Sequence, residues 1–175
     1  AEVGLIGFPN VGKSSILSRI SSAKPKIANY HFTTLSPNLG VVSMGEGRGF
    51  LAADIPGLIE GASEGQGLGH DFLRHVDRCR LLLHVIDIAG TDGRDPLDDL
   101  DALKNELELY MPGLSKRASM IIANKMDLEG AEENLERLRE KLASEVIYIY
   151  PVTAAIGELG DSLAGLRDQV TAAKK

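Results

Sequence analysis

One octapeptide near the start constrains the fold of this chain more than any other feature. Gly7-Phe8-Pro9-Asn10-Val11-Gly12-Lys13-Ser14 fits the pattern G-x-x-x-x-G-K-[ST]. A short apolar run at 3–6 precedes it, and the spacing of apolar residues predicts a helix over 15–22. In such a strand–loop–helix unit, glycines let successive backbone N–H groups surround phosphate oxygens. Lys13 would reach the β and γ phosphates, and the Ser14 hydroxyl would ligate Mg²⁺. The octapeptide therefore predicts a P-loop and not an ordinary glycine-rich turn.

The remainder of the chain alternates predicted strands with predicted helices. Apolar spacing and turn residues predict strands over 3–6, 40–44, 49–54, 81–88, 120–123 and 146–150, and further helices over 70–80, 98–110, 131–142 and 159–173. The segments 24–37 and 56–69 have no clean period and are expected to be loops. This alternation predicts an α/β fold with a mostly parallel six-stranded sheet and helices on both faces.

Length and composition limit the class of protein. The 175 residues suit one domain, 1–175, and the start at Ala1 directly before a strand suggests a domain from a longer protein. The net charge of −6 argues against a domain that wraps nucleic acid over its whole surface. The single cysteine, Cys79, cannot form an internal disulfide, so a small buried thiol in a cytoplasmic protein is expected. No apolar run reaches the length of a membrane span.

The tetrapeptide Asn124-Lys125-Met126-Asp127 indicates which base accompanies the phosphates. It follows an apolar strand, so it lies at the carboxyl edge of the sheet, where α/β proteins bind ligands. The Asp127 carboxylate can accept hydrogen bonds from N1–H and the 2-amino group of guanine, whereas adenine offers it no donor there. The Lys125 stem can lie over the base, and Asn124 can tie this loop to the P-loop. The alternative is that Asp127 only caps the helix that follows.

Three further segments complete the candidate site. Asp54-Ile55-Pro56-Gly57 ends another strand, where Asp54 can hold the Mg²⁺ shell through water and the Gly57 N–H can bond the γ-phosphate. Either Thr33 or Thr34 can ligate Mg²⁺ when the γ-phosphate is present, which would make its loop a switch. A backbone N–H within Thr153-Ala154-Ala155 can donate to guanine O6.

These motifs resemble a known family. Five segments match the five G motifs of translation-factor-class GTPases: Gly7–Ser14, Thr34, Asp54–Gly57, Asn124–Asp127 and Thr153–Ala155. The amino-acid sequences of 30–35, 54–62 and 67–75 also resemble those of the Obg family. The resemblance implies a Ras-like P-loop fold and places the Mg²⁺ threonine at Thr34, with Phe32 and Thr33 in the same nucleotide-binding loop. It also implies GTP and GDP as ligands, further domains beyond this one, and a role in large ribosomal subunit assembly and stress signalling. The ribosome or its RNA would then be a partner, through the flanking domains and the switch regions.

The sequence departs from many GTPases after Gly57. Leu58 stands where many GTPases carry the glutamine that orients the attacking water, so unaided hydrolysis is expected at or below roughly 10⁻⁴ per second. Asn10 stands where GTPases such as the TrmE and Era-like group carry an asparagine, so it can help to bind K⁺ near the phosphates and replace an arginine finger. The alternative is that Asn10 only shapes the turn of the P-loop. Lys13, Asn10 and Gly57 form the candidate catalytic set. Glu60, Gln66 and His70 are expected to face solvent or a partner, and the alternative is that they reach the site from their loop.

Two side-chain sets outside the motifs have competing interpretations. Arg74 and Arg78 lie four residues apart on one predicted helix face and can contact a partner or RNA, or form a solvated face. His84, inside an apolar strand, is expected to be a hydrogen-bonded core residue. The leading hypothesis is a slow GTPase switch, and the alternatives are a GDP/GTP-sensing interaction module whose hydrolysis is incidental, and a P-loop ATPase or small-molecule kinase.

Overall fold

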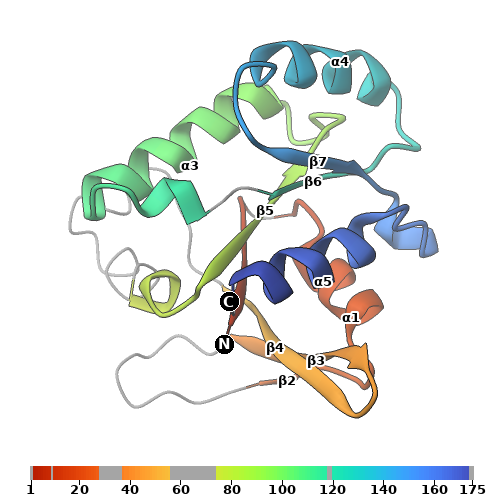
Figure 1. Ribbon diagram of the computed structural model, residues 1–175. Helices are drawn as coiled ribbons and strands as arrows, with labels where there is room; N and C mark the ends of the chain where they lie inside the picture. The colour runs from red at the N-terminus through yellow and green to blue at the C-terminus, as the bar shows by residue number, and fades with distance from the viewer. Residues whose placement is uncertain (1, 9, 28–36, 56–73, 118–119, 174–175) are drawn as a thin grey trace.

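The computed structural model describes residues 2–8, 10–27, 37–55, 74–117 and 120–173 (Figure 1). Its elements are, in order, β1 (Val3–Ile6), α1 (Lys13–Ile20), β2 (Lys26–Ile27), β3 (Asn38–Gly45), β4 (Arg48–Asp54), β5 (Leu81–Asp87), α3 (Pro96–Tyr110), the 3₁₀ helix η2 (Leu114–Arg117), β6 (Met120–Asn124), α4 (Ala131–Lys141), β7 (Tyr148–Pro151), the 3₁₀ helix η3 (Ala154–Ile156) and α5 (Ser162–Ala173). Of the helix predicted over 70–80, residues 74–77 are helical and 70–73 lie outside the described residues.

The strands form one sheet in the order β2-β3-β4-β1-β5-β6-β7. The four pairings from β4 to β7 are parallel, and the pairings β2–β3 and β3–β4 are antiparallel. The prediction of a mostly parallel α/β sheet is therefore confirmed, whereas the count of six strands is wrong. The seventh strand, β2, lies in the segment predicted as a loop. Its two residues are exposed and pair with β3 through the backbone at the sheet edge, so no apolar pattern marks it.

Helices cover both faces of the sheet, as the alternation of buried side chains along β6 makes clear. Ile122 belongs to the apolar cluster that includes residues of α1 and α5, whereas its neighbour Ile121 belongs to the cluster formed with α4. Because successive side chains of a strand point to opposite faces, Ile121 and Ile122 lie on opposite faces of β6 and each is covered by packed helices. Figure 1 shows α1 and α5 in front of the sheet and α4 above it.

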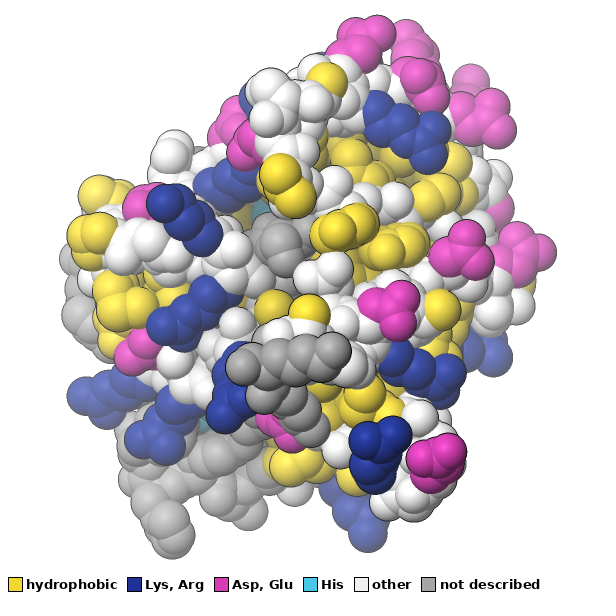
Figure 2. Space-filling model, in the orientation of Figure 1, with side chains coloured by type: hydrophobic (Ala, Val, Ile, Leu, Met, Phe, Trp, Pro, Cys, Tyr) yellow, Lys and Arg dark blue, Asp and Glu magenta, His cyan; other side chains and the backbone are white. Residues whose placement is uncertain are grey.

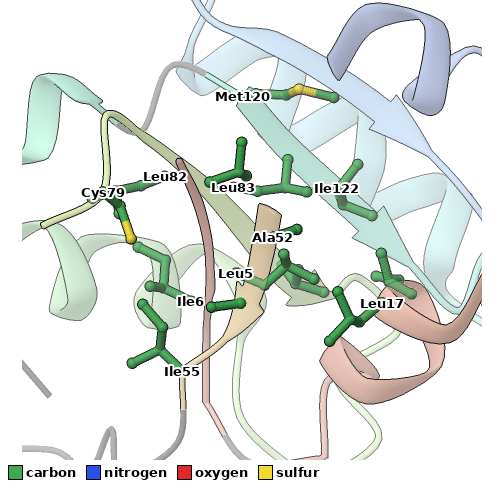
Figure 3. Packing of buried hydrophobic residues seen from close by; sticks show 14 of the residues in the cluster. Leu5, Ile6, Leu17, Ala52, Ile55, Cys79, Leu82, Leu83, Met120 and Ile122 are labelled. Atoms are coloured by element: carbon green, nitrogen blue, oxygen red, sulfur yellow. The ribbon is translucent and has the colours of Figure 1, made fainter. Parts of the chain in front are cut away.

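The central strand β1 is fully buried and packs closely against its surroundings (Figure 3). A Cβ at Gly4 would lie 2.8 Å from Sγ of Cys79 and 2.8 Å from Cδ1 of Ile55, so a larger residue there would require these side chains to shift. Cys79 is buried, as predicted, and burial raises the pKa of its thiol to about 11. The thiol is therefore protonated at neutral pH and unreactive.

His84 is buried within β5, which confirms its predicted place in the core. The predicted hydrogen bonding is wrong for one ring nitrogen, because Nε2 has no partner among the described residues. Burial, with a smaller effect from Lys104, lowers the pKa of His84 to about 3, so the imidazole is neutral at physiological pH. None of the described helices combines the length and the apolar character that a membrane crossing requires.

Candidate functional site

The P-loop joins β1 to α1 and carries two residues in left-handed backbone conformation. Asn10 has φ 65° and Gly12, the N-cap of α1, has φ 101°. Gly7 is required for a different reason, since a Cβ there would lie 2.4 Å from the backbone oxygen of Val85 on β5. The loop therefore follows β5 closely before it turns into the helix. Pro9 lies outside the described residues.

Lys13 and Ser14 begin α1 and both face Asp54 at the end of β4. The Ser14 hydroxyl donates to Oδ2 of Asp54 at 2.8 Å, and Lys13 Nζ lies 3.8 Å from Oδ1 of the same carboxylate. Lys13 Nζ also donates to the Gly7 carbonyl at 3.4 Å. Burial lowers the pKa of Lys13, and the charge of Asp54 opposes that shift. A hydroxyl and a carboxylate at hydrogen-bonding distance are the hard oxygen donors that fit Mg²⁺, which takes its remaining ligands from water and phosphate.

Asn124 joins three parts of the site from the end of β6. Its Nδ2 donates to the Val11 carbonyl of the P-loop at 2.9 Å, and its Oδ1 accepts from the Ala154 N–H at 3.0 Å. Gly12 leaves room for this contact, because a Cβ there would lie 2.2 Å from Nδ2 of Asn124. The predicted tie between Asn124 and the P-loop is therefore present in the structure.

Lys125 extends its ammonium group back to the P-loop. Nζ donates to the Asn10 carbonyl at 2.8 Å, to Thr91 Oγ1 at 3.0 Å and to Oδ2 of Asp87 at 3.1 Å. This arrangement holds the ammonium group of Lys125 between the P-loop and the end of β5. The predicted role of its aliphatic stem, lying over a base, stays a prediction.

Asp87 is a site residue that sequence reasoning missed. The carboxylate is buried at the end of β5 and accepts from the backbone N–H groups of residues 89, 90 and 91 as well as from the Thr91 hydroxyl. Burial alone would raise the pKa of Asp87, but hydrogen bonds from Thr91 and Lys125 outweigh it and lower the pKa. The signal was an aspartate that ends an apolar strand next to the P-loop strand.

Asp127 is exposed and lies in the turn that leads from β6 to α4. The alternative that it caps this helix is wrong, since the N-cap of α4 is Gly130 and no side chain caps it. The neighbouring Met126 N–H donates to the Val152 carbonyl at 3.2 Å, which holds the tetrapeptide against the end of β7. The bond from Met126 to Val152 therefore helps to set the position of Asp127, and the Asp127 carboxylate has no part in starting the helix.

The segment Thr153–Ala155 follows β7 and lies against Asn124. Thr153 is buried and pairs with Glu158 through backbone hydrogen bonds of 2.7 and 3.1 Å. Since the Ala154 N–H donates to Asn124, the Ala155 N–H becomes the candidate donor to a base. A pocket of about 430 Å³ opens between α1 and η3, and its lining consists of Ser14, Ser15, Ser18, Arg19, Ala154 and Ala155.

Phe8 makes a second contact that the sequence did not reveal. The side chain is buried, and the guanidinium carbon of Arg94 lies 4.9 Å from the centre of its ring, a cation–π distance. Arg94 comes from the loop before α3, so this loop covers part of the P-loop. The other predicted residues, Phe32, Thr33, Thr34 and Gly57, together with Leu58, Glu60, Gln66 and His70, lie outside the described residues.

Comparisons with known proteins agree with this geometry. The model of the 50S ribosome-binding GTPase family matches residues 2–125. GTPase Obg of Heliobacterium modesticaldum is 64% identical over 155 residues, which are 89% of this chain and 35% of that protein. GTPase Obg of Desulfitobacterium hafniense strain DCB-2 is 61% identical over all 175 residues, or 40% of its length. The chain thus spans well under half of the length of these relatives.

Solved structures support the fold. The G domain of the T. maritima FeoB iron transporter aligns with a TM-score of 0.68 and 23% identity, covering 99% of this chain and 98% of that domain. The cytosolic domain of the same transporter in a GDP form gives a TM-score of 0.69 at 21% identity, covering 99% of this chain and 63% of that one. With the matching family model and the Obg relatives, the P-loop fold leads to one assignment: the chain belongs to the family of 50S ribosome-binding GTPases, and its resemblance to Obg proteins is confirmed.

Proposed function

We propose that residues 1–175 form one domain that binds GTP and GDP with Mg²⁺ and hydrolyses GTP slowly as a switch. The observation that carries this proposal is the double hydrogen bond of Asn124, which links the P-loop to the two segments expected to contact the base. Phosphate recognition and base recognition are thereby held in one rigid unit. A P-loop ATPase or kinase would have no use for the acceptor at Asp127, because adenine has no donor to match it.

The residues around the phosphates have distinct tasks in this proposal. The backbone N–H groups of the P-loop between Gly7 and Lys13, except at Pro9, which has none, bind phosphate oxygens, and the Lys13 ammonium offsets charge on the β and γ phosphates. Ser14 would ligate Mg²⁺ directly, and Asp54 would hold it through water, after the bond between the two side chains opens. Thr34 and Gly57 would engage only when a γ-phosphate is present, so their loops would change state on hydrolysis.

Hydrolysis by the domain alone is expected to be slow, because Leu58 has no polar group with which to orient water. Asn10 supports a role for K⁺, since its side chain is exposed at the P-loop while Lys125 holds its backbone carbonyl. A K⁺ ion there would offset charge that develops between the β and γ phosphates. Turnover measured in K⁺ and in Na⁺ at equal ionic strength tests this role, and equal rates would exclude it.

The relatives suggest the partner. The family model describes 50S ribosome-binding GTPases, so we propose the large ribosomal subunit or its RNA as the partner, and a cytoplasmic location.

Charge is unevenly distributed over the surface, despite the net charge of −6. Figure 2 shows Asp and Glu side chains gathered over α4, whereas Lys and Arg side chains gather at the left of the view. Strong stimulation of hydrolysis by added 50S subunits would favour the switch over a sensing module with incidental hydrolysis.

Calorimetric titration of the purified chain with GDP, GTP and ADP, with and without Mg²⁺, tests the core of the proposal. We expect both guanine nucleotides to bind and ADP to bind far more weakly, because Asp127 would face the unprotonated N1 of adenine. Mg²⁺ should strengthen GTP binding most, since the γ-phosphate adds a ligand. Equal binding of ADP and GDP would refute the proposed base recognition.

A further inference from the structure

Arg19 in the last turn of α1 joins that helix to η3, which lies beside it (Figure 1). Its Nε donates to the Ala154 carbonyl at 3.2 Å, and its Nη2 donates to the Ala155 carbonyl at 3.0 Å. A guanidinium presents its N–H groups in a rigid planar fork, so bonds to two consecutive carbonyls define the orientation of the loop as well as its position. Gly157 completes the arrangement, because a Cβ there would lie 3.3 Å from Nη1 of Arg19.

The bond to the Ala154 carbonyl acts on the Ala155 amide, since both groups belong to one peptide unit. In a planar trans peptide the C=O and N–H bonds point in opposite directions. A donor held on the oxygen therefore determines where the N–H points. It also polarises the peptide unit, which makes the N–H a stronger donor. The preceding amide, that of Ala154, already donates to Asn124.

These contacts close a ring around the site. The P-loop continues directly into α1, α1 holds η3 through Arg19, η3 donates to Asn124, and Asn124 donates back to Val11 of the P-loop. Every link except Arg19 lies within a motif that the sequence had marked. Arg19 also lines the pocket between α1 and η3, together with Ser14, Ser15 and Ser18 of the same helix.

We propose that Arg19 is a positioning residue for guanine recognition, which aims the Ala155 N–H at O6 of the base. The inference rests on the proposed function and adds to it a residue outside the five motifs. Arg19 is exposed, so its bonds compete with water, and we expect loss of the side chain to speed GDP release about tenfold without abolishing binding.

The test compares Arg19→Gln with a matched control, Arg167→Gln. Arg167 on α5 also donates from Nε to a backbone carbonyl, that of Ser43 on β3 at 2.8 Å, but it does not contact the P-loop, Asn124 or η3 in any interaction described. Each variant is titrated with GDP and with 6-thioguanosine diphosphate, which keeps N1–H and the 2-amino group but replaces O6 with a weakly accepting sulfur. Release of a fluorescent GDP gives the dissociation rate, and thermal unfolding gives stability.

The parent and Arg167→Gln should prefer GDP to the thio analogue by the same factor, and Arg19→Gln should lose about tenfold of affinity for GDP while its preference shrinks toward one. Arg19→Lys, which can reach one carbonyl only, should lie between. Equal losses for both nucleotides in Arg19→Gln, or no loss, would overturn the positioning role while leaving GDP binding intact. Failure of the parent to bind GDP would instead overturn the proposed function itself.

Discussion

Replacing Asn124 with alanine removes the side chain that links the three motif segments. The change leaves the Val11 carbonyl and the Ala154 N–H without their partners, and both residues are buried, at 2% and 1% exposure. An unsatisfied buried polar group costs about 1–3 kcal/mol, so the two together should lower the free energy of unfolding by about 2–6 kcal/mol. Since a domain of this size is stable by about 5–15 kcal/mol, the variant should fold but be clearly weakened.

Urea unfolding without nucleotide, followed by circular dichroism, measures this loss, and titration with fluorescent GDP measures the effect on binding. Asn134→Ala is the matched control, because Asn134 is half-buried and its Nδ2 donates to one backbone carbonyl, that of Ile88 at 2.8 Å, which belongs to neither the P-loop nor η3. The control should lose about 1 kcal/mol and keep its GDP affinity. If Asn124→Ala stays within about 0.5 kcal/mol of the parent and binds GDP equally well, the linking role is wrong.

Three further perturbations follow from the structure. The pKa of His84 is about 3 in the folded protein and 6.5 for the free group, so protonation below pH 6.5 favours the unfolded state. Between pH 7.5 and 5.5 the free energy of unfolding of the parent should therefore fall by roughly 1 kcal/mol more than that of His84→Leu. An equal fall in both proteins, measured by urea unfolding, would contradict this. Asp87→Asn removes the counter-charge of Lys125, so calorimetry should show GDP binding about tenfold weaker; unchanged affinity would mean that the ion pair is irrelevant to binding. Gly12→Ala places a Cβ 2.2 Å from Nδ2 of Asn124 at a φ of 101°, so it should lower the free energy of unfolding in urea by about 2 kcal/mol or more. In the Asn124→Ala background the same change should cost much less, because the clash is gone. Equal costs in the two backgrounds would contradict this explanation.

The features that the sequence predicted well are those carried by local patterns. The P-loop was expected because its glycines, lysine and serine stand at fixed spacing between an apolar run and a helical one, and the structure has β1 and α1 there. The tie between Asn124 and the P-loop was expected because the segments that follow parallel strands meet at the carboxyl edge of the sheet, even though β5 separates β1 from β6. Both predictions need only local sequence patterns and the parallel direction of the strands.

The features that were missed depend on contacts between distant segments. Arg19 and Ala154 are 135 positions apart, and nothing in the helix pattern of α1 distinguishes this arginine from a solvated one. The pairing of β2 with β3 is likewise a backbone contact made by two exposed residues. Such contacts appear only once the fold has brought the segments together.

The ends of helices are a third place where the structure differs from the sequence prediction. The helix predicted to start at residue 98 begins at Pro96, with the Asp95 side chain accepting from the Leu97 N–H at 3.0 Å. Apolar spacing alone could not find this start, since the first turn has few inward residues, but the Asp-Pro pair is a typical N-cap and first position. Capping chemistry would therefore have corrected the boundary.

The most direct test of guanine recognition exchanges the acceptor at Asp127 for a donor. Calorimetry of the parent and Asp127→Asn with GDP and xanthosine diphosphate is the measurement, because xanthine carries a carbonyl where guanine carries the 2-amino group. The parent should prefer GDP strongly, and Asp127→Asn should lose GDP affinity and gain affinity for xanthosine diphosphate, since its amide can donate to that carbonyl. An Asp127→Asn variant that binds GDP as tightly as the parent would contradict the assignment of this carboxylate to the base.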